Sequence, residues 1–306
     1  MKYGYFNDQE KEYVITNPKT PVKWMNYIGG LDFGGFVDHT GGALICKGDP
    51  ALNRIVKYIP QLPSSSFKGE TLYIRIKKAD GYELISPFFI PVLTPYESYE
   101  CRVGNGYSIF TSVISGIKTE VRVFIPMGSQ REIRDITVTN LREDAVEIDI
   151  IPVIEYTHFE AAKQFNNADW VPQTMQSEVI TDGQYTLLKQ FAFMKKDTAI
   201  NYFTSNHKMS SFETDRKVFL GDNGYGTFVQ PLSLLNAELS NYLALREDNI
   251  AAGLHHMGTV EKDKTVRLIT QLGQYANYEA ELKEIHSYRD TSKVDLAFKE
   301  LKQHWE

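Results

Sequence analysis

The stretch EVRVFIPMGSQREIRDITVTNLREDAVEIDIIPVIE, residues 120–155, decides the fold class. Apolar side chains alternate with polar ones over residues 120–125 and again, less strictly, over residues 135–141. A polar, turn-forming segment, 140–144, then leads into a third alternating run at 146–150. A period of two is that of a β-strand with one buried face. We therefore predict strands here, the last two of them joined as an antiparallel hairpin.

The same period recurs along most of the chain, with almost no helical periodicity before residue 275. Further predicted strands are Glu12–Ile15, Ala43–Cys46, Leu72–Ile76, Ser108–Ile114, Thr198–Phe203 and Thr265–Leu272. So many strands in one stretch, without a Pro/Gly/Ser-rich linker, are typical of a single sandwich. We predict a mainly β fold in which residues 1–275 form a large antiparallel two-sheet β-sandwich, a super-sandwich.

The pattern changes near Tyr278. Residues 279–288 are rich in helix formers, and residues 290–292 supply candidate N-caps for a second helix. Its apolar positions recur at helical spacing and comprise Val294, Phe298, Leu301 and Trp305. We predict that residues 276–306 form a helical linker whose apolar stripe contacts a further domain beyond Glu306.

Composition narrows the class of protein and its partners. Hydrophobic residues make up 42% of the 306 positions, and no apolar run approaches the roughly 20 residues that cross a bilayer. The first residues lack the apolar core of a signal peptide, so we expect a cytoplasmic protein without a membrane partner. A net charge of -6 without long basic runs argues against nucleic acid. The two cysteines, Cys46 and Cys101, are predicted to be inert core thiols, and no zinc-like spacing is present.

Several stretches, in order and spacing, resemble a known family. They are Tyr3–Phe6, Glu12–Thr16, Pro21–Gly29, Gly41-Gly42, Tyr99–Arg102 with Gly104 and Gly106-Tyr107, Phe212–Arg216 with Phe219–Gly221, and Ala297–Lys302 with Trp305. Together they resemble the cellobiose and chitobiose phosphorylases of glycoside hydrolase family 94. That resemblance implies an N-terminal β-sandwich, a helical linker and then an (α/α) barrel, which these 306 residues do not include.

Three positions depart from the family pattern. Ala43 stands where a tyrosine usually follows the paired glycines, Val103 stands where a histidine follows the Glu-Cys-Arg motif, and Asn105 replaces a leucine. These departures, with the context Ile28-Gly29-Gly30, favour the laminaribiose phosphorylase branch, with cellobiose as the next substrate. Altered packing in the core is the alternative explanation of Ala43 and Val103.

The resemblance also implies the chemistry. Such an enzyme would be a homodimeric, inverting phosphorylase that splits a β-linked glucosyl disaccharide with inorganic phosphate into α-glucose 1-phosphate and glucose. One carboxylic acid protonates the glycosidic oxygen while phosphate attacks the anomeric carbon, so neither metal nor organic cofactor is expected. The family's general acid is an aspartate on the barrel, downstream of Glu306. We therefore assign no catalytic residue here and expect the 306-residue chain alone to be inactive.

One segment, residues 159–174, abandons alternation and gathers amides, a lysine and a tryptophan. Amides bind vicinal hydroxyls and an indole stacks on a pyranose, so the composition suits sugar binding, although a solvated surface loop uses the same residues. The resemblance implies that this loop reaches the acceptor side of the neighbouring subunit's active site. Carried over by position, the contacts are Lys163, Gln164, Asn166 and Asn167, with Asp169, Trp170, Gln173 and Thr174 behind them.

Two other functions stay open for the sandwich. A mutarotase-like site would pair a histidine with a glutamate as acid and base. The histidines are scattered and nothing in the sequence pairs them: His39, His158, His207, His255, His256, His286 and His304. The second alternative is a non-catalytic carbohydrate-binding module.

Overall fold

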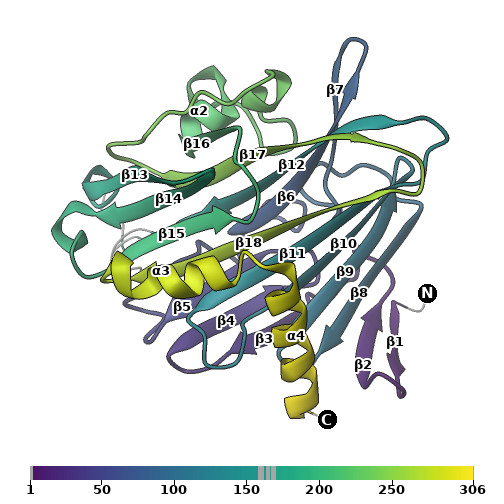
Figure 1. Cartoon of the computed structure of the whole chain (residues 1–306), viewed down its shortest axis with the longest axis horizontal. Coiled ribbons are helices and arrows are strands. Elements are labelled where there is room, and N and C mark those ends of the chain that lie inside the picture. The colour runs from purple at the N-terminus through teal and green to yellow at the C-terminus, as the bar shows by residue number, and fades with distance from the viewer. Residues whose placement is uncertain (1–2, 158–161, 163–165, 167–169, 306) are drawn as a thin grey trace.

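The fold is described from a computed structural model that covers residues 3–157, 162, 166 and 170–305. Its largest part is a ten-stranded antiparallel sheet that runs across the molecule (Figure 1). In spatial order the strands are β1 (Gly4–Asn7), β2 (Glu12–Ile15), β8 (Ser98–Gly104), β9 (Tyr107–Ile114), β10 (Ile117–Phe124), β11 (Arg131–Asn140), β18 (Thr265–Tyr275), β15 (Ile200–Ser205), β14 (Tyr185–Ala192) and β13 (Met175–Asp182). All the strands predicted from alternation overlap observed ones.

Two smaller antiparallel sheets face it. The five-stranded sheet contains β16 (Ser211–Asp215), β17 (Asn249–Val260), β12 (Val146–Glu155), β6 (Glu70–Lys78) and β7 (Gly81–Ile85). The three-stranded sheet contains β3 (Met25–Gly29), β4 (Phe33–Asp38) and β5 (Ala43–Lys47). The main hydrophobic core draws buried residues from all three sheets, among them Ile45, Ile74 and Val121. The predicted mainly β sandwich is confirmed, with its second layer divided between two sheets.

The predicted hairpin between residues 135–141 and 146–150 is wrong. β11 pairs with β10 and β18 in the large sheet, whereas β12 pairs with β6 and β17 in the five-stranded one. The turn therefore carries the chain from one layer to the other. Fully buried Asn140 fixes it, because its side-chain amide donates to the carbonyls of Asp144 and Val260, each at 2.9 Å. Val260 ends β17, so one asparagine joins two places where the chain changes sheets, after β11 and after β17.

A second buried layer lies on the outside of the five-stranded sheet. Here α2 (Arg216–Leu220) and the 3₁₀ turns η3 (Asp222–Gly224) and η4 (Leu232–Leu235) surround a small core with Tyr73 and Ile151. β12 is thus covered on both faces, which explains the continuous apolar run at its centre. The remaining 3₁₀ turns are η1 (Pro172–Thr174) and η2 (Phe193–Lys195).

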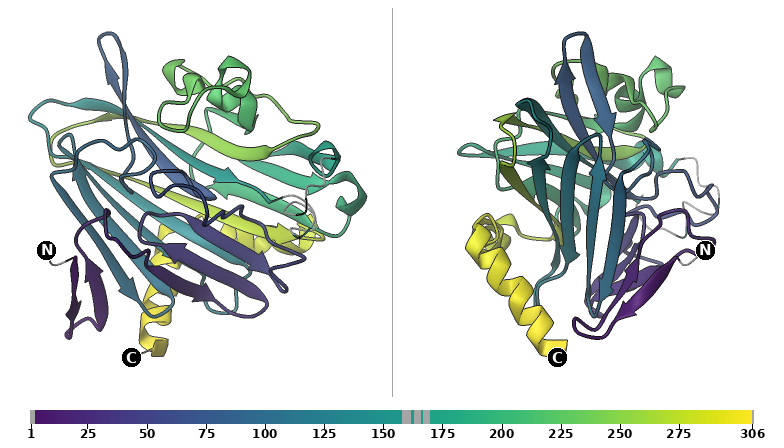
Figure 2. Two further views of the ribbon diagram at one scale, coloured as in Figure 1. Left: turned by 180° about the vertical axis from the view of Figure 1, so that it is seen from behind. Right: turned by 90° about the vertical axis from the view of Figure 1, so that its right-hand side faces the viewer.

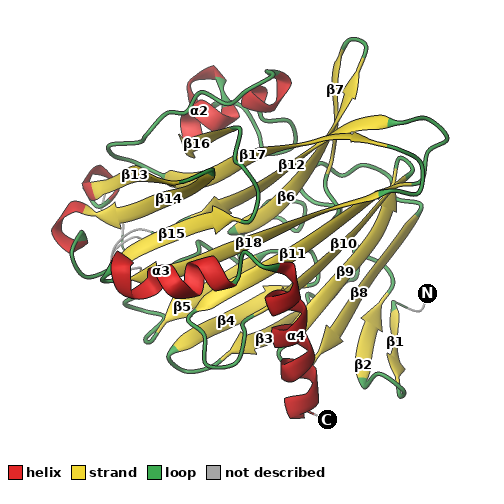
Figure 3. Ribbon diagram, in the orientation of Figure 1, coloured by secondary structure: helices red, strands yellow, loops and turns green. Residues whose placement is uncertain are grey.

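Two helices cross the outer face of the ten-stranded sheet, α3 (Tyr278–Ser287) and α4 (Thr291–Trp305), as Figures 2 and 3 show. The Asp290 carboxylate caps α4 by accepting from the Ser292 backbone N–H at 2.8 Å. The expectation that the stripe of α4 awaits another domain is wrong for most of its length. Val294, Phe298 and Leu301 are buried in a cluster with sheet residues that include Tyr107 and Phe124.

Buried ion pairs reinforce this contact. The Asp135 carboxylate of β11 accepts from Arg267 at 2.8 Å and also pairs with Arg122, and both arginines reach Asp295 of α4. Trp305 at the end of the stripe is 54% exposed. The helices therefore belong to the packed sandwich, and their role as a linker to a barrel stays a prediction.

No helix in the described part of the chain combines the length and apolar character needed to span a bilayer. Both cysteines are buried and unpaired, as predicted, and burial raises the pKa of the Cys46 thiol to about 11.

Candidate functional site

The polar segment at residues 159–174 connects β12 of the five-stranded sheet with β13 at the edge of the large sheet. Four predicted contact residues lie outside the described part of the chain: Lys163, Gln164, Asn167 and Asp169. Of the others, Asn166, Trp170 and Gln173 are exposed. Thr174 is buried and its hydroxyl donates to the Val171 carbonyl at 2.7 Å, so this side chain holds the local turn.

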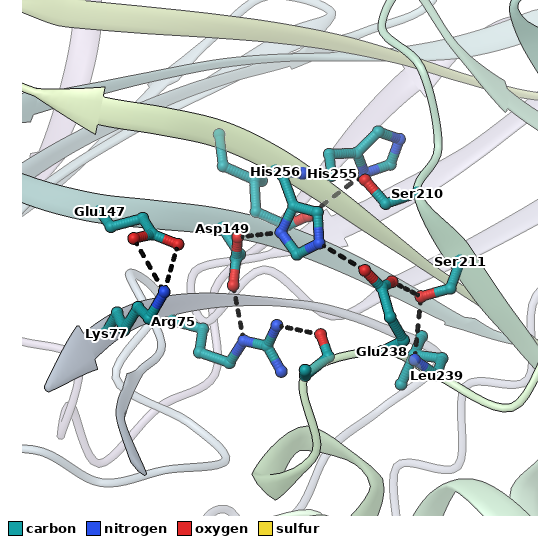
Figure 4. Close-up of polar contacts among 12 residues, drawn as sticks. Arg75, Lys77, Glu147, Asp149, Ser210, Ser211, Glu238, Leu239, His255 and His256 are labelled. Atoms are coloured by element: carbon teal, nitrogen blue, oxygen red, sulfur yellow. Dashed lines mark hydrogen bonds and ion pairs between the residues drawn. The ribbon is translucent and has the colours of Figure 1, made fainter. Parts of the chain in front are cut away.

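A histidine and a glutamate do meet elsewhere, on the five-stranded sheet (Figure 4). The His256 ring of β17 lies between two carboxylates, with Nδ1 at 2.5 Å from Asp149 and Nε2 at 2.8 Å from Glu238. Among the described histidines, His256 alone contacts a glutamate. No feature of the sequence predicted this pairing, because Asp149 is more than a hundred positions from His256 and Glu238 lies on a loop without a motif.

The contacts continue beyond the imidazole. The second oxygen of Asp149 accepts from Arg75 Nε at 2.7 Å, and Ser211 donates to the second oxygen of Glu238 at 2.6 Å. Arg75 is fully buried, and its remaining N–H groups donate to the carbonyls of Leu234, Asn236 and Ala237. We call the residues Arg75, Asp149, Ser211, Glu238 and His256 the ion network.

The ion network is not arranged for acid–base chemistry. Partial burial opposes the charged form of His256, but the hydrogen bonds that its ring donates to Asp149 and Glu238 outweigh this effect and raise the pKa of His256. Both ring nitrogens and all four carboxylate oxygens already have protein partners. A general acid or base must present a nitrogen or oxygen to the substrate. The network instead ties the 234–239 segment to the sheet.

The paired glycines of the family pattern have a structural explanation. Gly41 has φ +78°, and a Cβ there would lie 2.4 Å from the Phe88 ring. At Gly42 a Cβ would lie 2.8 Å from the Lys68 carbonyl oxygen. Neither position tolerates a side chain. The turn before them holds the buried Asp38 carboxylate, which accepts from Lys23 at 2.9 Å and from the Tyr58 hydroxyl at 2.8 Å.

The positions that depart from the family pattern lie in or beside the main core. Ala43 is completely buried there, and half-buried Val103 packs against it. Asn105 is exposed in the turn between β8 and β9. Ala43 lies in the main core and Val103 packs against that core, which supports the packing alternative.

With the fold described, the comparison with known families can be stated. The profile described as "Glycosyl hydrolase 94, supersandwich domain" matches residues 11–291, almost the whole chain. The chain belongs to this family. Its sandwich is thus a glycosyl hydrolase 94 supersandwich domain, as the motifs at its start and end predicted.

Curated relatives of the supersandwich domain are phosphorylases by name. The N,N'-diacetylchitobiose phosphorylase of Vibrio furnissii is 27% identical over an aligned length of 310 residues, gaps included, that covers 100% of this chain and 37% of the relative. The solabiose phosphorylase of Paenibacillus borealis is 26% identical over 277 residues, 89% of this chain and 34% of the relative. A 3-O-beta-D-glucopyranosyl-beta-D-glucuronide phosphorylase of the same organism is 33% identical over 138 residues, 45% of this chain and 16% of the relative. The chain spans little more than a third of the first two.

Solved structures agree on the fold of the supersandwich domain alone. A bacterial glucoamylase complexed with acarbose superposes with a TM-score of 0.53 at 8% identity, covering 94% of this chain and 39% of that one. An Escherichia coli K12 protein described as a candidate aldose 1-epimerase superposes with a TM-score of 0.50 at 6% identity, covering 83% of this chain and 99% of that one.

Proposed function

We propose that this chain is the N-terminal domain of an inverting glycoside phosphorylase. The observation that carries the proposal is the family match over residues 11–291, together with relatives that are named phosphorylases and extend well beyond it. The full-length protein would split a β-linked glucosyl disaccharide with inorganic phosphate into α-glucose 1-phosphate and glucose. Its general acid and phosphate ligands would lie outside the 306 residues.

Within that class we favour laminaribiose as the substrate and cellobiose next. The departures at Ala43, Val103 and Asn105 first suggested this branch, and one relative's name contains a 3-O-β-glucosyl linkage. The relatives that cover the whole chain are named for N,N'-diacetylchitobiose, which makes that disaccharide the necessary comparison.

The test incubates the full-length protein with phosphate and, separately, laminaribiose, cellobiose and N,N'-diacetylchitobiose, and measures the sugar 1-phosphate released. We expect α-glucose 1-phosphate, most rapidly from laminaribiose. Turnover of N,N'-diacetylchitobiose alone would overturn the glucosyl assignment but not the reaction class. No sugar phosphate from any of them would overturn both. The isolated 306-residue chain, tested alongside, is expected to be inactive.

We also propose that the 159–174 segment contributes to acceptor recognition in the neighbouring subunit of a homodimer. Asn166 is an exposed amide among the described residues of the segment, and it is one of the four contacts carried over first. Asn166→Ala in the full-length protein removes one hydrogen bond to a sugar hydroxyl, so the KM for the acceptor should rise roughly threefold to tenfold in the synthetic direction. The KM for α-glucose 1-phosphate is the internal control. An equal rise in both constants would contradict the proposal.

A further inference from the structure

A row of amide side chains crosses the ten-stranded sheet near its β13 edge. Gln190, Asn201 and Gln274 are direct neighbours in the register of β14, β15 and β18. The side-chain NH₂ of Asn201 donates to the side-chain oxygen of Gln190 at 2.7 Å, and the side-chain NH₂ of Gln274 donates to the side-chain oxygen of Asn201 at 2.8 Å. Asn53, after β5, exchanges two hydrogen bonds with Gln274 at 2.7 and 2.8 Å. We call these four residues the amide row.

The amide row continues the inner face of the sheet beyond the apolar core. Side chains on a strand alternate between faces, so each amide shares its face with the residue two positions away. Those residues are Leu188, Phe203 and Leu272, all buried in the main core. Where the apolar side chains stop, the amides border an open cavity of about 370 Å³. Leu52, Thr157 and Met175 line the same cavity, whose size falls within the range of small-molecule pockets.

The hydrogen bonds of the amide row leave polar atoms at its end without partners. Gln190 is 1% exposed and its Nε2 has no partner. The adjacent position in the row is Ser177 of β13, which is paired with Gln190, is 3% exposed and also has an unpartnered hydroxyl. The buried hydroxyl of Thr157, on the cavity wall, lacks a partner as well. Buried polar atoms left unpaired cost stability, so their concentration beside one cavity indicates a missing ligand.

The chemistry of the row indicates which ligand it would bind. The orientation of each side-chain amide is set by its neighbour. All four amides can therefore exchange their oxygen and NH₂ positions together, which leaves the side-chain oxygen of Gln190 unpaired instead of its NH₂. A hydroxyl group satisfies either arrangement, because it both donates and accepts. A carboxylate or phosphate satisfies one only. Arg54 and Lys195, the charged residues at the cavity, already have protein partners.

We propose that this cavity is a binding site for a neutral saccharide, held through its hydroxyl groups by Gln190 and Thr157, which both line it. The site uses residues of the sandwich only and does not depend on the proposed phosphorylase function. It also lies apart from the ion network, which is on the five-stranded sheet.

The test measures binding to the 306-residue chain by ligand-observed NMR and calorimetry, with glucose, laminaribiose and cellobiose as probes. We expect saturable binding of at least one probe at millimolar concentration. Gln190→Met keeps the length of the side chain and removes the amide, so affinity should fall roughly threefold to tenfold. Gln176→Met is the matched control. Gln176 precedes Ser177 on β13 and pairs with Phe191 rather than Gln190, so its side chain faces the opposite side of the sheet.

Thr157→Val provides a second variant in case Gln190→Met fails to fold. Its hydroxyl has no partner in the protein, so its loss should weaken sugar binding without lowering the melting temperature. No saturable binding by any probe would mean that the cavity holds water only and would overturn the proposal. Binding that Gln190→Met and Thr157→Val both leave unchanged would place the sugar elsewhere and would also overturn it. In the full-length protein, these variants should leave the KM for phosphorolysis unchanged, which separates this site from the proposed active site.

Discussion

The ion network and the amide row are both polar clusters that cross strands of a sheet, and they differ in how completely they are satisfied. In the ion network, every side-chain oxygen of Asp149 and Glu238 and both nitrogens of His256 have partners. In the amide row, the hydrogen bonds that pass from Gln274 through Asn201 end at Gln190, whose Nε2 has no partner. A saturated cluster has nothing left to offer a ligand, however reactive its residues look. An unsaturated one does, even when it contains no charge.

The largest predicted effect on stability follows from removing Asp149 of the ion network. Arg75 is fully buried, and Asp149→Ala would leave its guanidinium without a counter-charge. Loss of one partner of a buried pair costs about 3 to 5 kcal/mol, so the free energy of unfolding should fall by that amount in urea titrations. The matched control is Glu147→Ala. Its partner Lys77 lies two positions from Arg75 on the same strands, and both side chains of that pair are about half exposed. If the two variants lose equal stability, burial is not what gives the ion network its strength.

The amide row should respond less to a comparable deletion. Gln274→Leu removes the central residue and leaves amide atoms of Asn53 and Asn201 without partners. Unpaired buried amides cost about 2 to 4 kcal/mol together, less than a buried unpaired charge. Chemical denaturation compares this variant with Asp149→Ala directly. A loss larger than that of Asp149→Ala would reverse the ranking of the two clusters.

The smallest predicted effect is a change of stability with pH, and it involves the ion network only. The pKa of His256 is raised in the folded protein, so its contribution to stability is complete below its ordinary value of 6.5 and is lost as the pH rises through the folded value. The stability difference between the wild type and His256→Gln should therefore shrink as the pH rises above about 6.5. His255 titrates in the opposite sense, because burial lowers its pKa to about 4, but it is present in both proteins and cancels. A difference that grows with pH would contradict the assignment.

Alternation in the sequence located nine of the eighteen described strands and the class of fold, but it did not assign strands to sheets. Residues 135–141 and 146–150 look the same whether they pair side by side or face each other across a core. The burial of Asn140, which decides between these arrangements, depends on the distant carbonyl of Val260. The stripe of α4 was identified correctly and given the wrong partner for the same reason, since periodicity shows that a face is apolar but not what covers it.

The candidate site was less predictable than the fold. The polar composition of residues 159–174 identified a segment, and half of its proposed contacts lie outside the described residues. The amide row was missed, although the sequence holds a signal for it. Gln190, Asn201 and Gln274 each occupy an inward position two residues from a buried apolar one. Each is unremarkable alone, and only the register brings them together.

The contact between α4 and the sheet has a mechanical consequence. Phe298 and its neighbours prevent the helix from sliding, and the pairing of Asp295 with Arg122 and Arg267 prevents it from turning about its axis. Its direction is therefore fixed relative to the strands beneath it. Any polypeptide that continues past Trp305 would start from a helix whose direction is set by the sandwich. A small change of that direction at Asp295 would displace atoms far from the helix by a larger distance.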